Sequence, residues 1–260
     1  MHGSAPPSII DPDLLMLAYR SGIFPMADAR DDPEVFWIEP RIRAVLPLDG
    51  FHLSRSLAKC LRQDRFSVTC NRAFSRVVEE CAAPRDCMGE GEEGGSWISH
   101  RIQASYEELH RLGHAHSVEC WLTQDDGSEV LAGGLYGVGF DGAFCGESMF
   151  SRATDASKVA LAWLVAALKR AGASLLDCQF QTPHLQSLGA VELSQRRYLE
   201  RLEAAQAGYS SAAGVGVAGA GGAAVLSLPE GFAALLSDAA GAGLASSPGK
   251  LIAQSLTQTS

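Results

Sequence analysis

The sequence lacks the features that mark membrane, secreted and disulfide-linked proteins. No stretch of its 260 residues is apolar for long enough to span a bilayer. The opening residues, MHGSAPPSII, show no basic segment followed by an apolar one, so we expect no secretory signal, a cytoplasmic location and no membrane partner. The seven cysteines are odd in number and scattered, without a Cys-x-x-Cys pair, which argues against a disulfide framework and a zinc ribbon.

Two common catalytic signatures are also missing. There is no Gly-x-Ser-x-Gly elbow, so serine hydrolase chemistry has no support. His110, His114 and His116 lie near Cys120, but Gly113 interrupts any helical pair of histidines. No acidic ligand stands at a standard zinc spacing from them. We therefore expect neither a metal ion nor an organic cofactor.

Positive charge is scarce overall but concentrated in one segment. The chain has 21 basic and 30 acidic residues and a net charge of −9, which by itself argues against a nucleic-acid partner. Residues 41–76, however, hold eight basic residues and only two acidic ones. Here HLSRSLAKCLRQD predicts an amphipathic helix whose outer face carries Arg55, Lys59 and Arg62. Such a face is typical of a solvated helix surface and equally of a polyanion site.

Composition divides the chain into three parts. Residues 1–45 hold a helix predicted at 11–20, capped by Asp11 and stopped by Gly22, and we predict a small N-terminal domain there. Residues 46–207 are predicted to form the catalytic domain, with a glycine- and glutamate-rich loop at 87–96. Residues 208–260 contain the run AAGVGVAGAGGAA and are predicted to be a weakly structured Ala/Gly-rich extension that could dock locally on the rest of the chain.

The central part of the chain predicts a mixed sheet. The segments 114–122, 130–138 and 143–150 are predicted strands, and Phe140-Asp141-Gly142 signals a hairpin. A helix at 156–170 and an apolar strand at 174–180 follow. The fold class is therefore α/β (α+β). Three strands joined by hairpins, a helix and a further strand give the order of an N-acetyltransferase-like mixed sheet with flanking helices, which by itself implies no function.

Four strings of residues resemble one known family. They are GIFPM with FWIEP, SWI with GHAHSVECW, AGGLYGV with AFCGESMFSRATDASKVAL, and LLDCQFQTPHLQSLGA. Together they span most of residues 10–200 in the family's order, and on them the chain resembles the leucyl/phenylalanyl-tRNA–protein transferases. The resemblance implies an aminoacyltransferase that moves Leu or Phe from aminoacyl-tRNA to the N-terminal Arg or Lys of acceptor proteins. The new peptide bond marks those proteins for degradation.

Three polar residues are implied to carry the chemistry. Asp177 and Gln179 are two residues apart and face the same side of the predicted strand. A hydrogen bond from the Gln179 amide to Asp177 would turn the Gln179 carbonyl oxygen outward, towards an attacking amine; a purely structural hydrogen bond is the alternative. Glu147, on the preceding strand, could bind a cationic amine or form an ordinary salt bridge. The resemblance favours catalytic roles for all three, through positioning and electrostatics.

The aminoacyl side chain requires an apolar pocket. As residues alone, the candidates could equally be ordinary core. Leu164 and Leu168 stand where members of the family often carry phenylalanine, so the preference between Leu and Phe is left open. The six implied pocket residues are Leu135, Phe144, Met149, Leu164, Leu168 and Leu176.

Aromatic and basic residues are implied to bind the tRNA. Trp97 resembles the family's aromatic that stacks on the terminal adenosine. The family often has a tryptophan directly after Phe-Pro; here that position is Met26, so stacking there is weaker or is supplied by Trp37. The basic helix face described above would bind acceptor-stem phosphates without reading sequence. We expect a monomer.

Two other functions fit parts of the sequence. An acyl-CoA-dependent N-acyltransferase would hold a pyrophosphate on a glycine-bearing loop, but SRATDAS has no glycine and Asp155 would oppose a phosphate. A non-catalytic tRNA-binding protein would explain the basic helix and Trp97, but it leaves the three polar residues without a role. Acyl-CoA binding would favour the first alternative, and tRNA binding without turnover the second.

Overall fold

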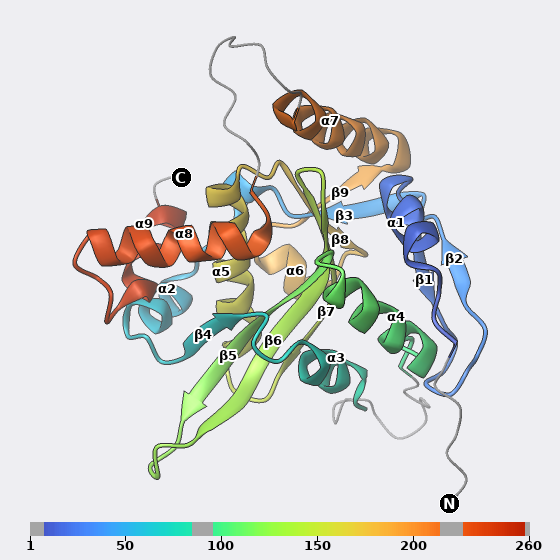
Figure 1. The fold of residues 1–260 in the computed structure, drawn as a ribbon. Helices are drawn as coiled ribbons and strands as arrows, with labels where there is room; N and C mark the ends of the chain where they lie inside the picture. Colours follow the sequence, from blue (N-terminus) through green and yellow to red (C-terminus); the bar gives the residue numbers. More distant parts are fainter. Residues whose placement is uncertain (1–7, 85–95, 214–225, 258–260) are drawn as a thin grey trace, which may run out of the picture.

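The computed structural model describes residues 8–84, 96–213 and 226–257 (Figure 1). Within them, no helix combines the length and the apolar character that crossing a membrane requires. The helices are α1 (Pro12–Arg20), α2 (Arg55–Arg62), α3 (Phe74–Ala82), α4 (His100–Arg111), α5 (Ala156–Ala171), α6 (Pro183–Ser187), α7 (Gln195–Ala213), α8 (Leu228–Gly241), α9 (Pro248–Thr257) and the 3-10 turn η1 (Leu48–Gly50). The strands are β1 (Phe24–Met26), β2 (Phe36–Ile38), β3 (Ile42–Val45), β4 (Ser67–Cys70), β5 (Ala115–Thr123), β6 (Glu129–Phe140), β7 (Ala143–Ser151), β8 (Leu175–Gln179) and β9 (Val191–Ser194).

A seven-stranded mixed sheet organises the molecule, in the order β4-β5-β6-β7-β8-β3-β9. From β4 to β7 all neighbouring strands are antiparallel. β7 and β8 are parallel, and α5 makes the crossover between them, as a parallel pair requires. β3 and β9 add further antiparallel pairs, and β1 and β2 form a separate small sheet. The predicted α/β fold with a mixed sheet and flanking helices is confirmed.

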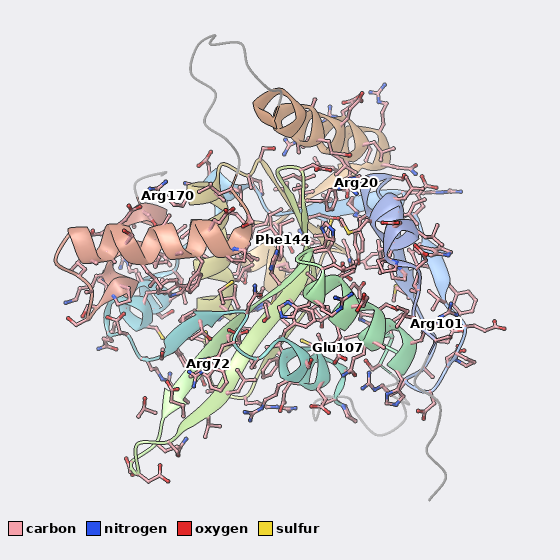
Figure 2. All side chains as sticks on the ribbon, in the orientation of Figure 1. Arg20, Arg72, Arg101, Glu107, Phe144 and Arg170 are labelled. Carbon is pink, nitrogen blue, oxygen red and sulfur yellow. The ribbon has the colours of Figure 1, made fainter. Side chains whose placement is uncertain are left out.

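The large sheet separates two hydrophobic cores. One core holds the sheet against α5, with α2, α8 and α9 packed around that helix; the other is covered by α1, α3, α4 and α7 (Figure 1). α5 is buried along most of its length. Phe144 lies deep in the interior, whereas Arg72 and Arg170 lie at the outer surface (Figure 2).

Local sequence signals place the ends of several elements. The Asp11 side chain accepts hydrogen bonds from the backbone N–H groups of Asp13 and Leu14 and so caps α1. α5 ends at Gly172, whose φ of 78° is the left-handed conformation that glycine adopts without strain. Asp141 and Gly142 both have positive φ, as a two-residue hairpin turn between β6 and β7 requires. These three boundaries agree with the sequence predictions.

The N-terminal segment enters the large sheet. β3 lies between β8 and β9, so the predicted domain boundary at residue 45 falls at the end of a strand that belongs to the main sheet. The boundary itself stays a prediction. Most of the predicted loop at 87–96 lies outside the described residues, as does nearly all of the Ala/Gly run.

The C-terminal region is more structured than its composition indicates. The prediction of weak structure is wrong for α8 and α9, because Leu228, Phe232 and Ile252 are buried in the core around α5. Small residues make this packing possible: a Cβ on Gly231 would lie 2.5 Å from the carbonyl oxygen of Ala167. Glycine content was one reason to predict a weakly structured extension. At Gly231, however, the lack of a side chain permits close contact between two helices.

We predict that α8 contributes to the stability of the whole fold. Phe232 is 5% exposed and its ring centroid lies 5.2 Å from that of Trp163. Phe232→Ala should lower the free energy of unfolding by about 3–5 kcal/mol, because it empties a packed site. Leu236→Ala on the same helix is the control: this leucine is 41% exposed, and its loss should change stability by roughly 0.5 kcal/mol. Similar losses in denaturant titrations of the two variants would contradict the prediction.

Candidate active site

A cavity of about 400 Å³ opens where β7 and β8 separate. The two strands pair only between residues 143–145 and 175–177. The residues that follow, 146–149 on β7 and 178–179 on β8, line the cavity together with residues of β6, α5 and α6. The divergence of two parallel strands therefore creates the space.

The cavity brings together most of the predicted pocket and two of the three predicted catalytic residues. Its lining is mainly apolar and includes Leu135, Met149, Leu164 and Leu176, together with Leu161, Cys178 and Leu185, which were not predicted from the sequence. Glu147 and Gln179 line the same cavity. An apolar chamber next to a carboxyl and an amide suits a ligand with an apolar side chain and a polar reacting group.

A β-bulge places Glu147. Tyr136 pairs with Ser148 and the next residue of β6, Gly137, pairs with Gly146, so Glu147 is an extra residue opposite this step. Bulges next to active sites change the direction in which a side chain points. Gly137 permits the close approach here, since a Cβ on it would lie 2.2 Å from the Cys145 carbonyl oxygen.

A tight turn places Gln179. Its φ is 61°, and the N–H of Phe180 donates to the carbonyl oxygen of Cys178 at 2.8 Å. Together these define a γ-turn of the rare, strained kind, centred on a residue that is not glycine. Strain of this type costs about 1–3 kcal/mol and persists only where the surroundings hold it. The hydrogen bonds of Gln179 provide that support.

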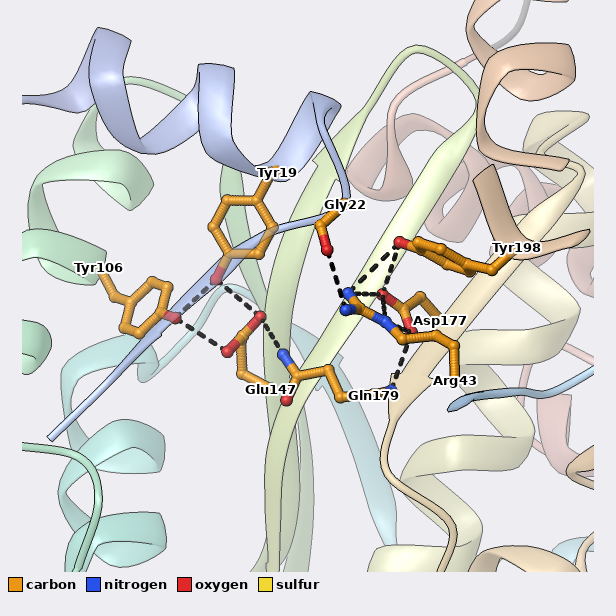
Figure 3. Close-up of polar contacts among 8 residues, drawn as sticks. All are labelled: Tyr19, Gly22, Arg43, Tyr106, Glu147, Asp177, Gln179 and Tyr198. Carbon is orange, nitrogen blue, oxygen red and sulfur yellow. Dashed lines mark hydrogen bonds and ion pairs between the residues drawn. The ribbon is translucent and has the colours of Figure 1, made fainter. Parts of the chain in front are cut away.

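Glu147 and Gln179 are joined by hydrogen bonds to each other and to two tyrosines (Figure 3). The Glu147 Oε1 atom accepts from Gln179 Nε2 at 2.9 Å and from the Tyr19 hydroxyl at 2.7 Å. Its Oε2 atom lies 2.8 Å from the Tyr106 hydroxyl. Tyr19 comes from α1 and Tyr106 from α4, so elements distant in the chain hold the Gln179 side chain. Gln179 Oε1 has no hydrogen-bond partner among the described residues and is available to a ligand.

The Glu147 carboxyl changes its protonation state near neutral pH. Burial raises its pKa from the usual 4.5 to about 7. The hydrogen bonds from Tyr19, Tyr106 and Gln179 act in the opposite direction, and the charge of Asp177 adds to the rise. Burial also raises the pKa of both tyrosines well above 10, so their hydroxyls stay protonated.

Asp177 does not line the cavity and is fully buried beside it. Arg43 donates to both carboxylate oxygens, from Nε at 2.9 Å and from Nη2 at 2.6 Å. The Tyr198 hydroxyl donates at 3.0 Å, and the backbone N–H of Gln179 donates at 2.8 Å. Arg43 itself is 1% exposed, donates to the Gly22 carbonyl and lies over the rings of two aromatic residues. Asp177 thus anchors the backbone of the strained turn.

The expected contact between the Gln179 amide and Asp177 is wrong in one respect. The backbone N–H of Gln179, not its side chain, donates to Asp177, and the side-chain amide donates to Glu147. The positive φ of Gln179 directs the two groups to different acceptors. Four supporting residues were not predicted from the sequence: Tyr19, Arg43, Tyr106 and Tyr198. All four are buried in the folded protein. A single sequence does not show which polar residues folding will bury, so no sequence pattern pointed to them.

Two predicted pocket residues lie elsewhere. Phe144 and Leu168 line a separate cavity of about 330 Å³ near the β6–β7 hairpin and the end of α5. Phe144 is on β7 before the strands separate, and Leu168 is one helical turn past Leu164. Their assignment to the aminoacyl pocket is therefore not supported by this geometry.

The residues predicted to bind tRNA are dispersed. Met26 and Trp97 line the cavity. Trp37 is 42% exposed on β2 and does not line it. Arg55, Lys59 and Arg62 are exposed on α2, which packs against α5 and α9. Arg43, counted in the same basic segment, is buried in its ion pair, so that segment is not one continuous surface.

The histidine group has structural contacts instead of a metal-site arrangement. His110 stacks on Phe74 and its Nδ1 lies 2.8 Å from the carbonyl oxygen of Ala115. His116 Nδ1 lies 3.0 Å from the side-chain nitrogen of Asn71. In the described ranges, His, Cys, Asp and Glu side chains do not gather in any set of three that could hold a metal ion.

Comparison with known proteins gives consistent matches. The model of the family described as "Leucyl/phenylalanyl-tRNA protein transferase" matches residues 45–203, and that of its N-terminal domain matches residues 9–41. The chain is 59% identical to the leucyl/phenylalanyl-tRNA–protein transferase of Novosphingobium aromaticivorans, over 98% of each chain. It is 56% identical to the same enzyme of Rhizorhabdus wittichii, over 81% of this chain and 79% of that one. A solved structure, "The structure of L-PGS from Bacillus licheniformis", superposes with a TM-score of 0.34 and 14% identity. The match covers 69% of this chain and 56% of that one. This similarity is too weak to support any conclusion.

We predict that the Arg43–Asp177 pair is essential to stability. Arg43→Ala should lower the free energy of unfolding by about 3–5 kcal/mol, because it leaves a carboxylate buried without its counter-ion. Arg20→Ala is the matched control: it breaks an Arg–Asp pair of 2.7 Å whose arginine side chain is 38% exposed, and it should cost about 0–1 kcal/mol. Denaturant unfolding measures both values, and equal losses would count against the assignment.

Proposed function

This chain belongs to the leucyl/phenylalanyl-tRNA–protein transferase family, and we propose that it moves Leu or Phe from aminoacyl-tRNA to the N-terminal Arg or Lys of acceptor proteins. The product carries a new peptide bond at its N-terminus, which marks it for degradation. In this proposal the enzyme acts as a cytoplasmic monomer without a metal or organic cofactor.

One observation carries the proposal for the site: an apolar cavity meets the carbonyl oxygen of Gln179, which has no hydrogen-bond partner in the part of the chain that the structure describes. The aminoacyl side chain occupies the part of the cavity lined by Leu135, Met149, Leu164 and Leu176. Its ester carbonyl then lies beside Gln179. A leucine or phenylalanine side chain gains from leaving water at such a site, whereas a charged one would not.

The acceptor amine is positioned by Gln179. Its Oε1 atom accepts a hydrogen bond from the amine and directs the nitrogen lone pair to the ester carbonyl. A new C–N bond forms, the bond from the carbonyl carbon to the tRNA 3′ oxygen breaks, and the amine proton passes to that oxygen. An amide is a very weak base, so Gln179 contributes orientation and Asp177 fixes its backbone.

The tRNA end is held by residues around the cavity and by α2. Trp97 and Met26 line the cavity, where the terminal adenosine would stack. Trp37, on β2, is paired with Pro25 and therefore faces the other side of this small sheet from Met26, outside the cavity, so stacking on the adenosine falls to Trp97 in this proposal. The exposed Arg55, Lys59 and Arg62 on α2 bind backbone phosphates, a contact that positions the tRNA without reading its sequence.

The reaction is tested by incubating the protein with radiolabelled leucyl-tRNA or phenylalanyl-tRNA and a peptide that begins with arginine. We expect label on the peptide. Gln179→Ala should reduce kcat/KM by about 100-fold or more, because the amine loses its positioning partner. Gln186→Ala, an exposed glutamine on α6, should leave the rate unchanged. A folded wild-type protein that transfers neither amino acid, or that acylates the peptide from acyl-CoA, would refute the proposal.

The pocket assignment is tested by two leucines one helical turn apart. Leu164 lines the cavity and Leu168 does not. Leu164→Ala should lower kcat/KM for leucyl-tRNA by about tenfold and shift preference towards phenylalanyl-tRNA, because the pocket becomes larger. Leu168→Ala should destabilise the fold comparably but leave the preference for the two tRNAs unchanged. A change of preference in the second variant alone would place the pocket at the other cavity.

A further inference from the structure

The Glu147 carboxyl forms a closed ring with two tyrosine hydroxyls (Figure 3). The Tyr19 and Tyr106 oxygens are 2.6 Å apart. Each also lies close to one carboxyl oxygen, at 2.7 Å from Oε1 for Tyr19 and 2.8 Å from Oε2 for Tyr106. All three separations are those of O–H···O hydrogen bonds, and each such bond needs one proton.

The number of protons decides the state of the ring. The two tyrosines supply two protons, since each hydroxyl carries one. If Glu147 is ionised, both protons point to its oxygens, and the two tyrosine oxygens face each other at 2.6 Å without a proton between them. If Glu147 is protonated, there are three protons for three contacts.

One arrangement then satisfies every group. Glu147 Oε2–H donates to Tyr106, Tyr106 donates to Tyr19, and Tyr19 donates to Oε1. As the carbonyl oxygen of a neutral carboxyl, Oε1 has a second lone pair, which accepts the hydrogen bond from Gln179 Nε2. The ring is therefore complete only with the third proton, and Gln179 is attached to it at one point.

Within residues 8–84, 96–213 and 226–257, no cationic side chain forms a hydrogen bond or ion pair with Glu147. On β8 its charged neighbour is Asp177, whose own charge is balanced by Arg43. On β6 the neighbour is the neutral, fully buried Tyr136. Arg30 lies beyond Tyr136 and donates to the Ile98 carbonyl and to Gln103. A carboxylate buried without a counter-ion is costly, whereas a neutral carboxyl with its hydrogen bonds made is not.

We propose that Glu147 works as a neutral positioning residue, which holds the Gln179 side chain through the closed Tyr19–Tyr106–Glu147 ring, and does not act as an anion that binds a cationic amine. The consequence for activity rests on the proposed function of Gln179. The protonated state of Glu147 does not rest on it.

The protonation state can be tested without the reaction. Glu147→Gln preserves the ring, because its amide nitrogen donates to Tyr106 and its carbonyl oxygen accepts from Tyr19 and Gln179. The folded-state pKa of Glu147 is raised from 4.5 to about 7, so the stability due to its proton is complete below pH 4.5 and is lost as the pH rises through 7. The melting temperature of the wild type should therefore fall relative to that of Glu147→Gln across this range. The proposal would be overturned if the difference in melting temperature between the two proteins did not change with pH. It would also be overturned if the wild type became the more stable of the two as the pH rises.

The role in catalysis has its own measurement, made with labelled leucyl-tRNA and the arginine peptide. Glu147→Gln should lose the wild-type change in rate near neutral pH, and any loss of activity should appear in kcat and not in KM for the peptide. Tyr106→Phe opens the ring and should lower kcat more than it raises KM. A rise of about 100-fold in peptide KM for Glu147→Gln would show that the charge binds the amine and would refute the neutral role. If the wild type transfers nothing, the proposed function fails, and the melting experiment alone decides the state of the ring.

Discussion

The site depends on where two parallel strands stop pairing. β7 and β8 exchange hydrogen bonds only between residues 143–145 and 175–177, and beyond that point they diverge. Backbone groups that lose a ladder partner inside a protein must find another or face a cavity. In this molecule the bulge at Glu147 and the γ-turn at Gln179 occur directly after the last pair. The irregular backbone and the chamber of about 400 Å³ are thus two aspects of one divergence.

Two polar clusters flank the divergence, and their charge balance differs. Where the strands still pair, Asp177 is neutralised by Arg43, from β3, and the cluster is a fixed anchor. Past the last pair, the described partners of Glu147 are hydroxyl and amide groups, and burial raises its pKa to about 7, so its charge depends on pH. Gln179 connects the two, through its backbone N–H to one carboxyl and its side-chain amide to the other. Gln179, which positions the reacting amine in the proposed mechanism, is thereby restrained at both ends.

Segments remote from the sheet centre complete both clusters. α1 brings Tyr19 and the N-terminal segment brings Arg43, while α7 brings Tyr198. Tyr19, Tyr106 and Tyr198 all belong to the hydrophobic core on the face opposite α5. The packing of that core therefore also fixes the positions of the hydroxyl groups that bind Glu147 and Asp177. The other core, with α8 and α9 around α5, supports the aliphatic side of the cavity through Leu161 and Leu164.

Local patterns were sufficient for much of the fold. The strand patterns at 114–122, 130–138 and 143–150, the Asp141–Gly142 turn and the stop at Gly172 predicted the strands, the hairpin and the crossover helix, because each depends on neighbours in the chain. The resemblance directed attention to Gln179, Asp177 and Glu147. The composition of the C-terminal region misled, because glycine and alanine serve a flexible chain and a tight helix contact equally well.

The sequence alone therefore determined the central elements between residues 114 and 180, the fold class and three of the polar residues at the site. What only the tertiary structure decided was their partners. Tyr19 lies 128 residues from Glu147, and Arg43 lies 134 residues from Asp177. Periodicity tells which side of an element is buried, but not which distant side chain it meets there. The partner decides whether a buried carboxyl is neutralised by a cation or by a proton, and the two carboxyls of this site differ in that respect.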